Sequence, residues 1–199
     1  MLKTLSFLST KESEVVGIDE VGYGAIAGPL ITCVLYIPWI HNTKFLSIRD
    51  SKQLTEKNRN IWYNIITKYC FYSIGIASNN EIDKINIRNA TVLACQRAVN
   101  NFSYKANKYF VDGNLKFNSQ KYVSIVKGDE KFIEIAAASV IAKVTRDQIM
   151  ILYSKKEKYS KYKWLSNKGY CTAQHISKLK IFGPTNLHRK TFIKNILKS

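Results

Sequence analysis

Three short apolar runs in this chain each lead to a carboxylate. In chain order they are residues 15–18 before Asp19 and Glu20, residues 109–111 before Asp112, and residues 123–126 before Lys127, Gly128 and Asp129. Buried strands that end in acids can surround one pocket, and carboxylate oxygens are the ligands that Mg²⁺ and Mn²⁺ prefer. A single acid of this kind often only caps a helix or starts a turn. Three runs together in a basic chain favour a metal-dependent nuclease.

The charge of the chain is strongly positive and unevenly placed. Its 199 residues carry a net charge of +17. Residues 151–199 hold 12 Lys or Arg and one acid, Glu157, so they contribute +11 of that total. A field of this sign attracts polyanions, which makes nucleic acid the expected partner. The abundance of Lys, Asn and Ile also suggests that composition bias accounts for part of the excess.

The cysteines and the N-terminal residues give no sign of secretion. The four cysteines, Cys33, Cys70, Cys95 and Cys171, lack metal-ligand or redox spacing, which predicts reduced thiols and no zinc site. Residues 1–14 contain only a short apolar patch, too short for a secretory signal or a membrane span. We therefore expect a cytoplasmic protein with no membrane association, acting as a monomer.

The pattern along residues 15–126 favours strands first and then alternating helix and strand. Strands are expected at 15–18 and 30–37, joined by a loop with three glycines, and at 71–77, 109–111 and 123–126. Apolar residues at helical spacing predict a helix after Thr55, and a second helix is expected to begin with Asn86 as its N-cap. This order predicts an α/β fold, with a sheet covered by helices on both faces.

The remaining residues are expected to be helical. A long helix is predicted over 132–153, where Ser139, Lys143 and Asp147 recur four residues apart on one face. That polar stripe could hold substrate phosphates, or Lys143 and Asp147 could form an internal ion pair. Thr172 is a candidate N-cap of a later helix that Gly183 and Pro184 end. We expect one domain over 1–199, with a core at about 15–153 and a basic helical part at about 154–199.

In motif content and order the chain closely resembles ribonuclease HII, the type 2 ribonuclease H family. The matching segments span nearly the whole chain and are 17–22, 28–29, 51–54, 111–113, 127–129, 136–147, 168–170 with Thr172 and His175, and 188–189 before Phe192. Type 3 enzymes look similar in the catalytic region but carry an additional N-terminal domain. Only eighteen residues precede Asp19, so type 2 fits better.

The resemblance implies a ribonuclease H-like mixed sheet flanked by helices, and a site of four carboxylates. These catalytic and metal-binding residues are Asp19, Glu20, Asp112 and Asp129. The implied reaction is hydrolysis of RNA in RNA–DNA hybrids and on the 5′ side of ribonucleotides embedded in duplex DNA. Crowded carboxylates repel one another unless cations lie between them, so two Mn²⁺ or Mg²⁺ ions are expected. A two-metal mechanism would give 3′-hydroxyl and 5′-phosphate ends.

The resemblance also implies substrate contacts. The expected residues are Gly22, Tyr23 and Gly24 for the ribose 2′-hydroxyl, Tyr170 for the sugar at the RNA–DNA junction, Lys52, Lys143 and Lys168 for phosphates, and Ser139 on the polar stripe. Two positions depart from the family pattern: Tyr23 replaces the usual arginine between two glycines, and Cys171 replaces a proline. His41, His175 and His188 show no ligand spacing and are expected to be structural.

Other readings of the sequence remain open at this point. A non-catalytic nucleic-acid-binding protein could keep the fold, although a binder gains nothing from acids where phosphates must lie. A ribonuclease H-like DNA nuclease or resolvase would share the metal chemistry without needing the segment around Tyr170. The C-terminus has no convincing motif for binding a replication clamp.

Overall fold

A mixed sheet of five strands forms the centre of the molecule. The computed structural model describes residues 15–38, 48 and 54–198. The strands are β1 (Val15–Val21), β2 (Leu30–Tyr36), β3 (Phe71–Ala77), β4 (Lys108–Asp112) and β5 (Tyr122–Ile125). Their order across the sheet is β3-β2-β1-β4-β5, with β1 antiparallel to β2 and parallel to β4, and β4 parallel to β5. Three strand ends carrying acids therefore lie next to one another.

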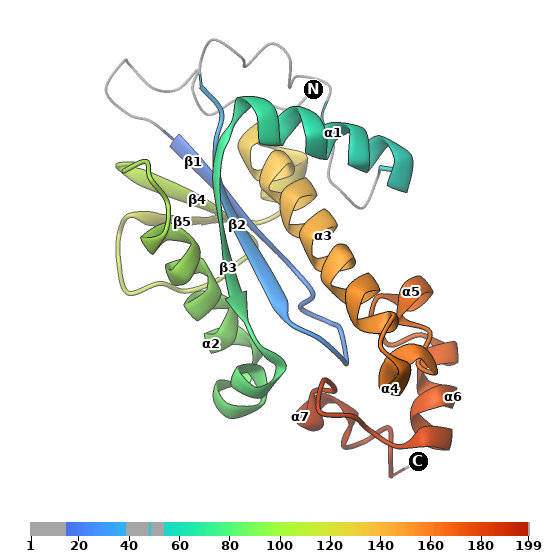
Figure 1. Cartoon of the computed structure of the whole chain (residues 1–199). Helices are drawn as coiled ribbons and strands as arrows, with labels where there is room; N and C mark the ends of the chain where they lie inside the picture. The colour runs from blue at the N-terminus through green and yellow to red at the C-terminus, as the bar shows by residue number, and fades with distance from the viewer. Residues whose placement is uncertain (1–14, 39–47, 49–53, 199) are drawn as a thin grey trace.

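Helices cover both faces of the sheet, as the sequence predicted (Figure 1). The helices are α1 (Glu56–Tyr69), α2 (Asn79–Asn100), α3 (Ile133–Ser154), α4 (Glu157–Ser160), α5 (Trp164–Asn167), α6 (Ala173–Phe182) and α7 (Lys190–Ile193), with a 3₁₀ turn, η3, at Gly128–Glu130. Figure 1 shows α2 on one face, α1 and α3 on the other, and α4–α7 gathered beyond the end of α3. The expected α/β class and the helical C-terminal part are confirmed.

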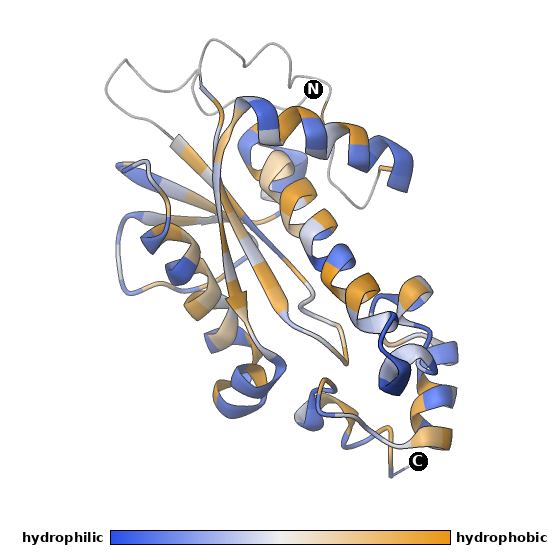
Figure 2. Ribbon diagram, in the orientation of Figure 1, coloured by the Kyte–Doolittle hydropathy of each residue, from blue (hydrophilic) through white to orange (hydrophobic). Residues whose placement is uncertain are grey.

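Alternation along β2 explains the two-sided core. Ile31, Cys33 and Leu35 pack with α3, whereas Leu30 and Val34 pack with α2. Because both faces are covered, β2 is apolar along almost its whole length, which Figure 2 shows as warm colours on the strand.

Helix α3 lies directly against β1 at a glycine. A Cβ atom on Gly17 would collide with the backbone of Glu134 and with the nitrogen of Ile135. The absence of a side chain lets the N-terminal half of α3 approach β1 at backbone distance. That close approach brings the small, buried face of α3 next to Asp19, two residues further along β1.

The N-cap predicted at Asn86 is present, and a further helical segment, which the sequence did not predict, precedes it. Helix α2 begins at Asn79, where Ser78 and Glu81 form a reciprocal capping box. Two helical segments of α2 meet at Asn86, which caps the second as predicted: its backbone leaves helical geometry at φ 65°, and its Oδ1 accepts a hydrogen bond of 3.1 Å from the Asn89 N–H. The polar start at Ser78 was missed because few apolar residues mark the first turns. Thr172 caps α6 as predicted, and α1 follows Thr55 as predicted, with the Thr55 side chain as its N-cap.

Candidate active site

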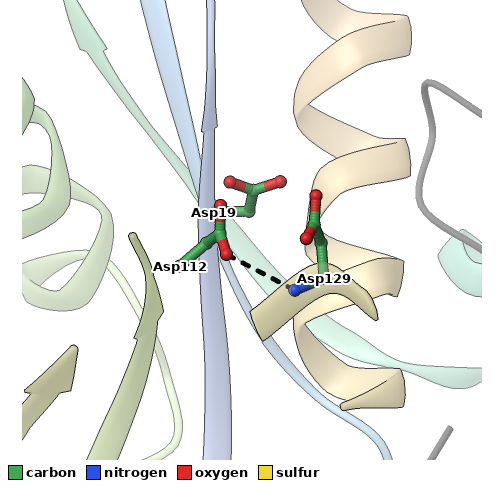
Figure 3. Close-up of side chains that lie close together, drawn as sticks. All are labelled: Asp19, Asp112 and Asp129. Carbon is green, nitrogen blue, oxygen red and sulfur yellow. Dashed lines mark hydrogen bonds between the residues drawn. The ribbon is translucent and has the colours of Figure 1, made fainter. Parts of the chain in front are cut away.

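Three of the predicted carboxylates meet at one point. One oxygen from each of Asp19, Asp112 and Asp129 lies within 4.8 Å of the others. Asp19 comes from β1, Asp112 ends β4, and Asp129 follows β5 in η3. Figure 3 shows the three side chains turned toward a common space between the sheet and α3. Asp19 and Asp129 are buried, and Asp112 is half-buried.

The turn after β5 is shaped to deliver Asp129. Lys127 adopts a left-handed conformation at φ 56°, and the backbone N–H of Gly128 then donates to Asp112 Oδ1 at 2.6 Å. The Asp129 N–H points to the same oxygen at 3.4 Å (Figure 3). A Cβ on Gly128 would press against Ile135 and Asp112, so glycine permits this tight turn. Asp112 therefore fixes the backbone that carries Asp129.

The electrostatics of Asp19 fit a cation site. Burial, followed by the negative charges of Glu20 and Asp112, raises the pKa of Asp19 well above its usual value. Hydrogen bonds from the Ser139 side chain and the Glu20 N–H oppose that rise. Asp19 Oδ2 is buried and has no hydrogen-bond partner. A buried carboxylate oxygen without a donor, next to two further carboxylates, is the donor set that a divalent cation satisfies.

Glu20 does not join this group of three. Successive side chains on a strand point to opposite faces, and Glu20 follows Asp19 directly on β1. Glu20 pairs with Thr32 of β2, whose hydroxyl lies 3.9 Å from Cys95 Sγ of α2, so this register position belongs to the α2 side of the sheet. The role of Glu20 as a ligand stays a prediction.

The glycine loop between β1 and β2 is held by the C-terminal part of the chain. Ala25 pairs with Tyr170, and Ala27 pairs with His188, in isolated antiparallel bridges. The N–H groups of Ile26 and Ala27 donate to the Gly169 carbonyl at 2.9 and 3.2 Å. The predicted substrate residues of this loop lie at its tip: Gly22 at φ 101°, exposed Tyr23 and exposed Gly24.

Two buried arginines under the loop were not predicted as site residues. Arg146 of α3 donates to the carbonyls of Pro29, Ala27 and Lys168 at 3.0, 3.0 and 2.8 Å. Arg189 donates to the carbonyls of Gly28 and Tyr23 at 3.1 and 3.0 Å. Burial, and then the charge of Arg146, lowers the pKa of Arg189 to about 9. Arginines inside matched motifs were the available signal, but their carbonyl partners lie 22 to 166 residues away along the chain.

The Tyr170 ring lies beside two cationic groups. Its centroid is 4.8 Å from the Arg146 guanidinium carbon and 5.1 Å from Lys143 Nζ. Lys143 Nζ also forms an ion pair of 2.9 Å with Asp147, so the internal pairing considered for the polar stripe is present. Tyr170, which was predicted to contact the substrate sugar, is thus half-buried next to the glycine loop, with two cationic groups beside its ring.

The other predicted contacts lie in different surroundings. Ser139 is fully buried and acts on Asp19 rather than on solvent. Lys168 is half-buried, and its ammonium donates to the Leu165 carbonyl. Lys52 and His41 lie outside the described residues. His175 and His188 are buried and hydrogen-bonded to each other, in accordance with a structural role.

Comparisons with known proteins agree with this architecture. A family model described as ribonuclease HII matches residues 16–195. Ribonuclease HII of Orientia tsutsugamushi (strain Boryong) is 42% identical over 193 residues, covering 96% of this chain and 92% of that protein. Ribonuclease HII of Ehrlichia chaffeensis is 43% identical over 189 residues, covering 93% and 88%.

Solved structures share the fold. The ribonuclease H2 of Pyrococcus horikoshii matches with a TM-score of 0.72 and 25% identity, over 93% of this chain and 97% of that one. The PCNA:RNase HII complex from Archaeoglobus fulgidus matches with a TM-score of 0.74 and 23% identity, over 88% and 93%. Within the described residues, no helix has the length and apolarity needed to cross a membrane. On the family model and on identities above 40% over nearly its full length, the chain belongs to the ribonuclease HII family.

Proposed function

We propose that this chain is an endoribonuclease that cleaves RNA in RNA–DNA hybrids and on the 5′ side of ribonucleotides embedded in duplex DNA. The observation that carries the proposal is the group of three carboxylates within 4.8 Å, in a chain of the ribonuclease HII family. The buried acids also argue against a protein that only binds nucleic acid, because three negative charges would repel the phosphates at that point.

The acids would hold the metal. Asp19 would be the central ligand, since its buried Oδ2 has no hydrogen-bond donor, while Oδ1 accepts the Glu20 N–H at 2.7 Å and so holds the side chain in place. Asp112, Asp129 and Glu20 would complete the ligand set. A pair of Mg²⁺ or Mn²⁺ ions, when bound there, lowers the pKa of water and stabilises the charge on the leaving oxygen. The expected products carry 3′-hydroxyl and 5′-phosphate ends.

The loop and Tyr170 would supply recognition of the ribonucleotide. Gly22, Tyr23 and Gly24 form the tip of a loop that is bridged to Tyr170 through Ala25. Backbone groups of the tip would meet the ribose 2′-hydroxyl, and the Tyr170 ring would pack on the neighbouring sugar. This arrangement is supported by the backbone hydrogen bonds that place both elements on one surface.

The lysines would contact phosphates around this surface. Lys143 is paired with Asp147 and lies beside the Tyr170 ring, so a substrate phosphate would share its ammonium with that carboxylate. Lys168 and Lys52 are further phosphate contacts carried over from the family motifs. Ser139 would act indirectly, by holding Asp19 in the ligand geometry.

The chain would work as a unit. We propose one ribonuclease H-like catalytic domain, supported by the pairing of the glycine loop with residues 169–170 and 187–189. The four cysteines are free, which fits action in the cytoplasm, and we propose that the protein acts as a monomer.

A panel of substrates tests this function. A DNA duplex with one ribonucleotide, a long RNA–DNA hybrid and an all-DNA duplex are incubated with the protein in Mg²⁺, Mn²⁺ or EDTA. We expect cleavage of the first two in either metal, 5′ to the single ribonucleotide, and none in EDTA. Metal-dependent cleavage of the all-DNA duplex would instead indicate a DNA nuclease.

A further inference from the structure

A chain of three buried aromatic side chains ends at the backbone of Tyr170. Trp164 of α5, His175 of α6 and His188 before α7 have at most 1% of their surface exposed. Trp164 Nε1 lies 3.0 Å from His175 Nε2, and His188 Nε2 lies 3.1 Å from the same nitrogen. On its other side, His175 Nδ1 lies 2.9 Å from the carbonyl oxygen of Tyr170. Three elements of the C-terminal part therefore converge on one carbonyl.

The contacts fix where the protons lie. The Thr185 N–H donates to His188 Nδ1 at 2.9 Å, so the single proton of neutral His188 is on Nε2. That N–H, together with the Trp164 N–H, donates to His175 Nε2. The proton of His175 must then be on Nδ1, where it donates to the Tyr170 carbonyl. Burial lowers the pKa of both histidines, that of His188 to about 4, which keeps them neutral at pH 7.

The backbone of Tyr170 needs hydrogen bonds to fix its direction, because the chain before it turns sharply. Lys168 has φ 49° and Gly169 has φ 80°, both in the left-handed region. The Gly169 carbonyl is occupied by the glycine loop, and the Tyr170 N–H donates to the Asn167 carbonyl at 2.9 Å. The ring Nδ1–H of His175 and the backbone N–H of Thr172, at 2.9 Å each, are the donors that set the direction of the Tyr170 carbonyl.

We propose that His175 is a positioning residue for ribonucleotide recognition: its Nδ1–H, set by Trp164 and His188, fixes the backbone of Tyr170 and so aims the ring at the substrate sugar. The proposal rests on the proposed function. It assigns to the buried Trp164–His175–His188 chain an effect on substrate cleavage that packing alone would not produce.

Two substitutions of His175 separate this role from packing. The side-chain amide of asparagine can take the place of Nδ1, so His175→Asn keeps a donor for the Tyr170 carbonyl and loses the acceptor for Trp164. Glutamine reaches the place of Nε2, so His175→Gln keeps that acceptor and leaves the Tyr170 carbonyl without this donor. Each variant therefore loses one of the two hydrogen-bonding functions of His175 and keeps the other, so each is the control of the other.

The readouts are kcat/KM on a duplex with one ribonucleotide and the Kd for an all-DNA duplex of the same sequence. We expect His175→Gln to lose about fivefold to tenfold in kcat/KM, the effect of one buried hydrogen bond, with the Kd unchanged. His175→Asn should remain near the wild type. Equal losses in the two variants, or no loss in either, would overturn the proposal.

A spectroscopic measurement decides the case if a variant does not fold. In ¹⁵N imidazole spectra of the wild type at pH 7, we expect His175 protonated on Nδ1 and His188 on Nε2. The reverse tautomers, or a charged ring at either position, would contradict the proposal. Absence of ribonucleotide cleavage by the wild type would refute the proposed function instead, and the spectra would still report on the hydrogen-bond chain.

Discussion

Replacing Asp19 by asparagine should remove catalysis and at the same time stabilise the metal-free protein. Asp19 lies buried within 4.8 Å of two other carboxylates, and burial and its neighbours raise its pKa. Like charges at 4.8 Å repel by roughly 3 kcal/mol at an effective dielectric constant of about 20. In the metal-free protein this repulsion therefore lowers the free energy of unfolding. A bound cation, a proton or a neutral side chain at position 19 removes the repulsion.

The expected gain is smaller than this full repulsion. Part of it is already relieved because Asp19 holds a proton for some of the time when its pKa is raised. Asparagine is nearly the same size, and its oxygen can still accept the Glu20 N–H at the Asp19 Oδ1 position. We expect Asp19→Asn to gain about 1–3 kcal/mol in EDTA, or about 2–4 °C in Tm for each kcal/mol.

Thermal melts with and without Mn²⁺ provide the assay. The wild type should melt lower in EDTA and rise with Mn²⁺, whereas Asp19→Asn should melt higher in EDTA and respond weakly to the ion. Mg²⁺-dependent cleavage should be lost while duplex binding remains. A variant that melts at or below the wild type in EDTA would refute the argument from repulsion, and one that still cleaves would refute the role of Asp19.

Four further outcomes are expected. In EDTA, the stability of the wild type relative to Asp19→Asn should rise as pH falls from 7 toward the ordinary aspartate pKa, because the folded protein takes up the Asp19 proton first; denaturant titrations at several pH values measure this. Tyr170→Ala should lower cleavage at an embedded ribonucleotide by about tenfold, from lost stacking of ~1–3 kcal/mol, and leave all-DNA binding unchanged; equal loss in both assays would contradict this role. Arg146→Lys should cost about 2–3 kcal/mol in urea unfolding, since one ammonium cannot serve three carbonyls in the fork geometry of Arg146; a loss below ~1 kcal/mol would contradict the clamp. Tyr23→Arg adds a charge at the exposed loop tip, so binding should tighten and the salt dependence of log K should steepen by about one unit; an unchanged slope would place residue 23 away from the phosphates.

The acids could be predicted because each one carries a local signal. A strand that packs in a core appears in the sequence as a short apolar run, and an acid at or just after the end of that run stands out against it. Asp19, Asp112 and Asp129 are each tied to such a run, so knowing that β1, β4 and β5 are parallel neighbours is enough to bring them together. Glu20 follows the same apolar run as Asp19. Its side chain lies on the other face of β1, because successive side chains on a strand point to opposite faces.

The supports of the glycine loop carry no comparable signal. Arg146 and Arg189 bind backbone carbonyl oxygens, and every residue of the chain has such an oxygen to offer. The partners of Arg146 at Pro29 and Ala27 are 117 and 119 residues away, and that of Arg189 at Tyr23 is 166 residues away. Hydrogen bonds of this kind depend on tertiary structure, so a pattern in the sequence can mark the arginine but cannot name its partner.

This difference changes how the basic C-terminal residues are understood. From composition, residues 154–199 look like an appendage that attracts polyanions through charge alone. In the structure, Gly169, Leu187 and Arg189 exchange backbone hydrogen bonds with the glycine loop, and Tyr170 lies at the same junction. The segment that concentrates positive charge is thus also the segment that shapes the loop. Neutralising exposed lysines there should weaken binding of every duplex alike, whereas disturbing the junction should act on the ribonucleotide alone.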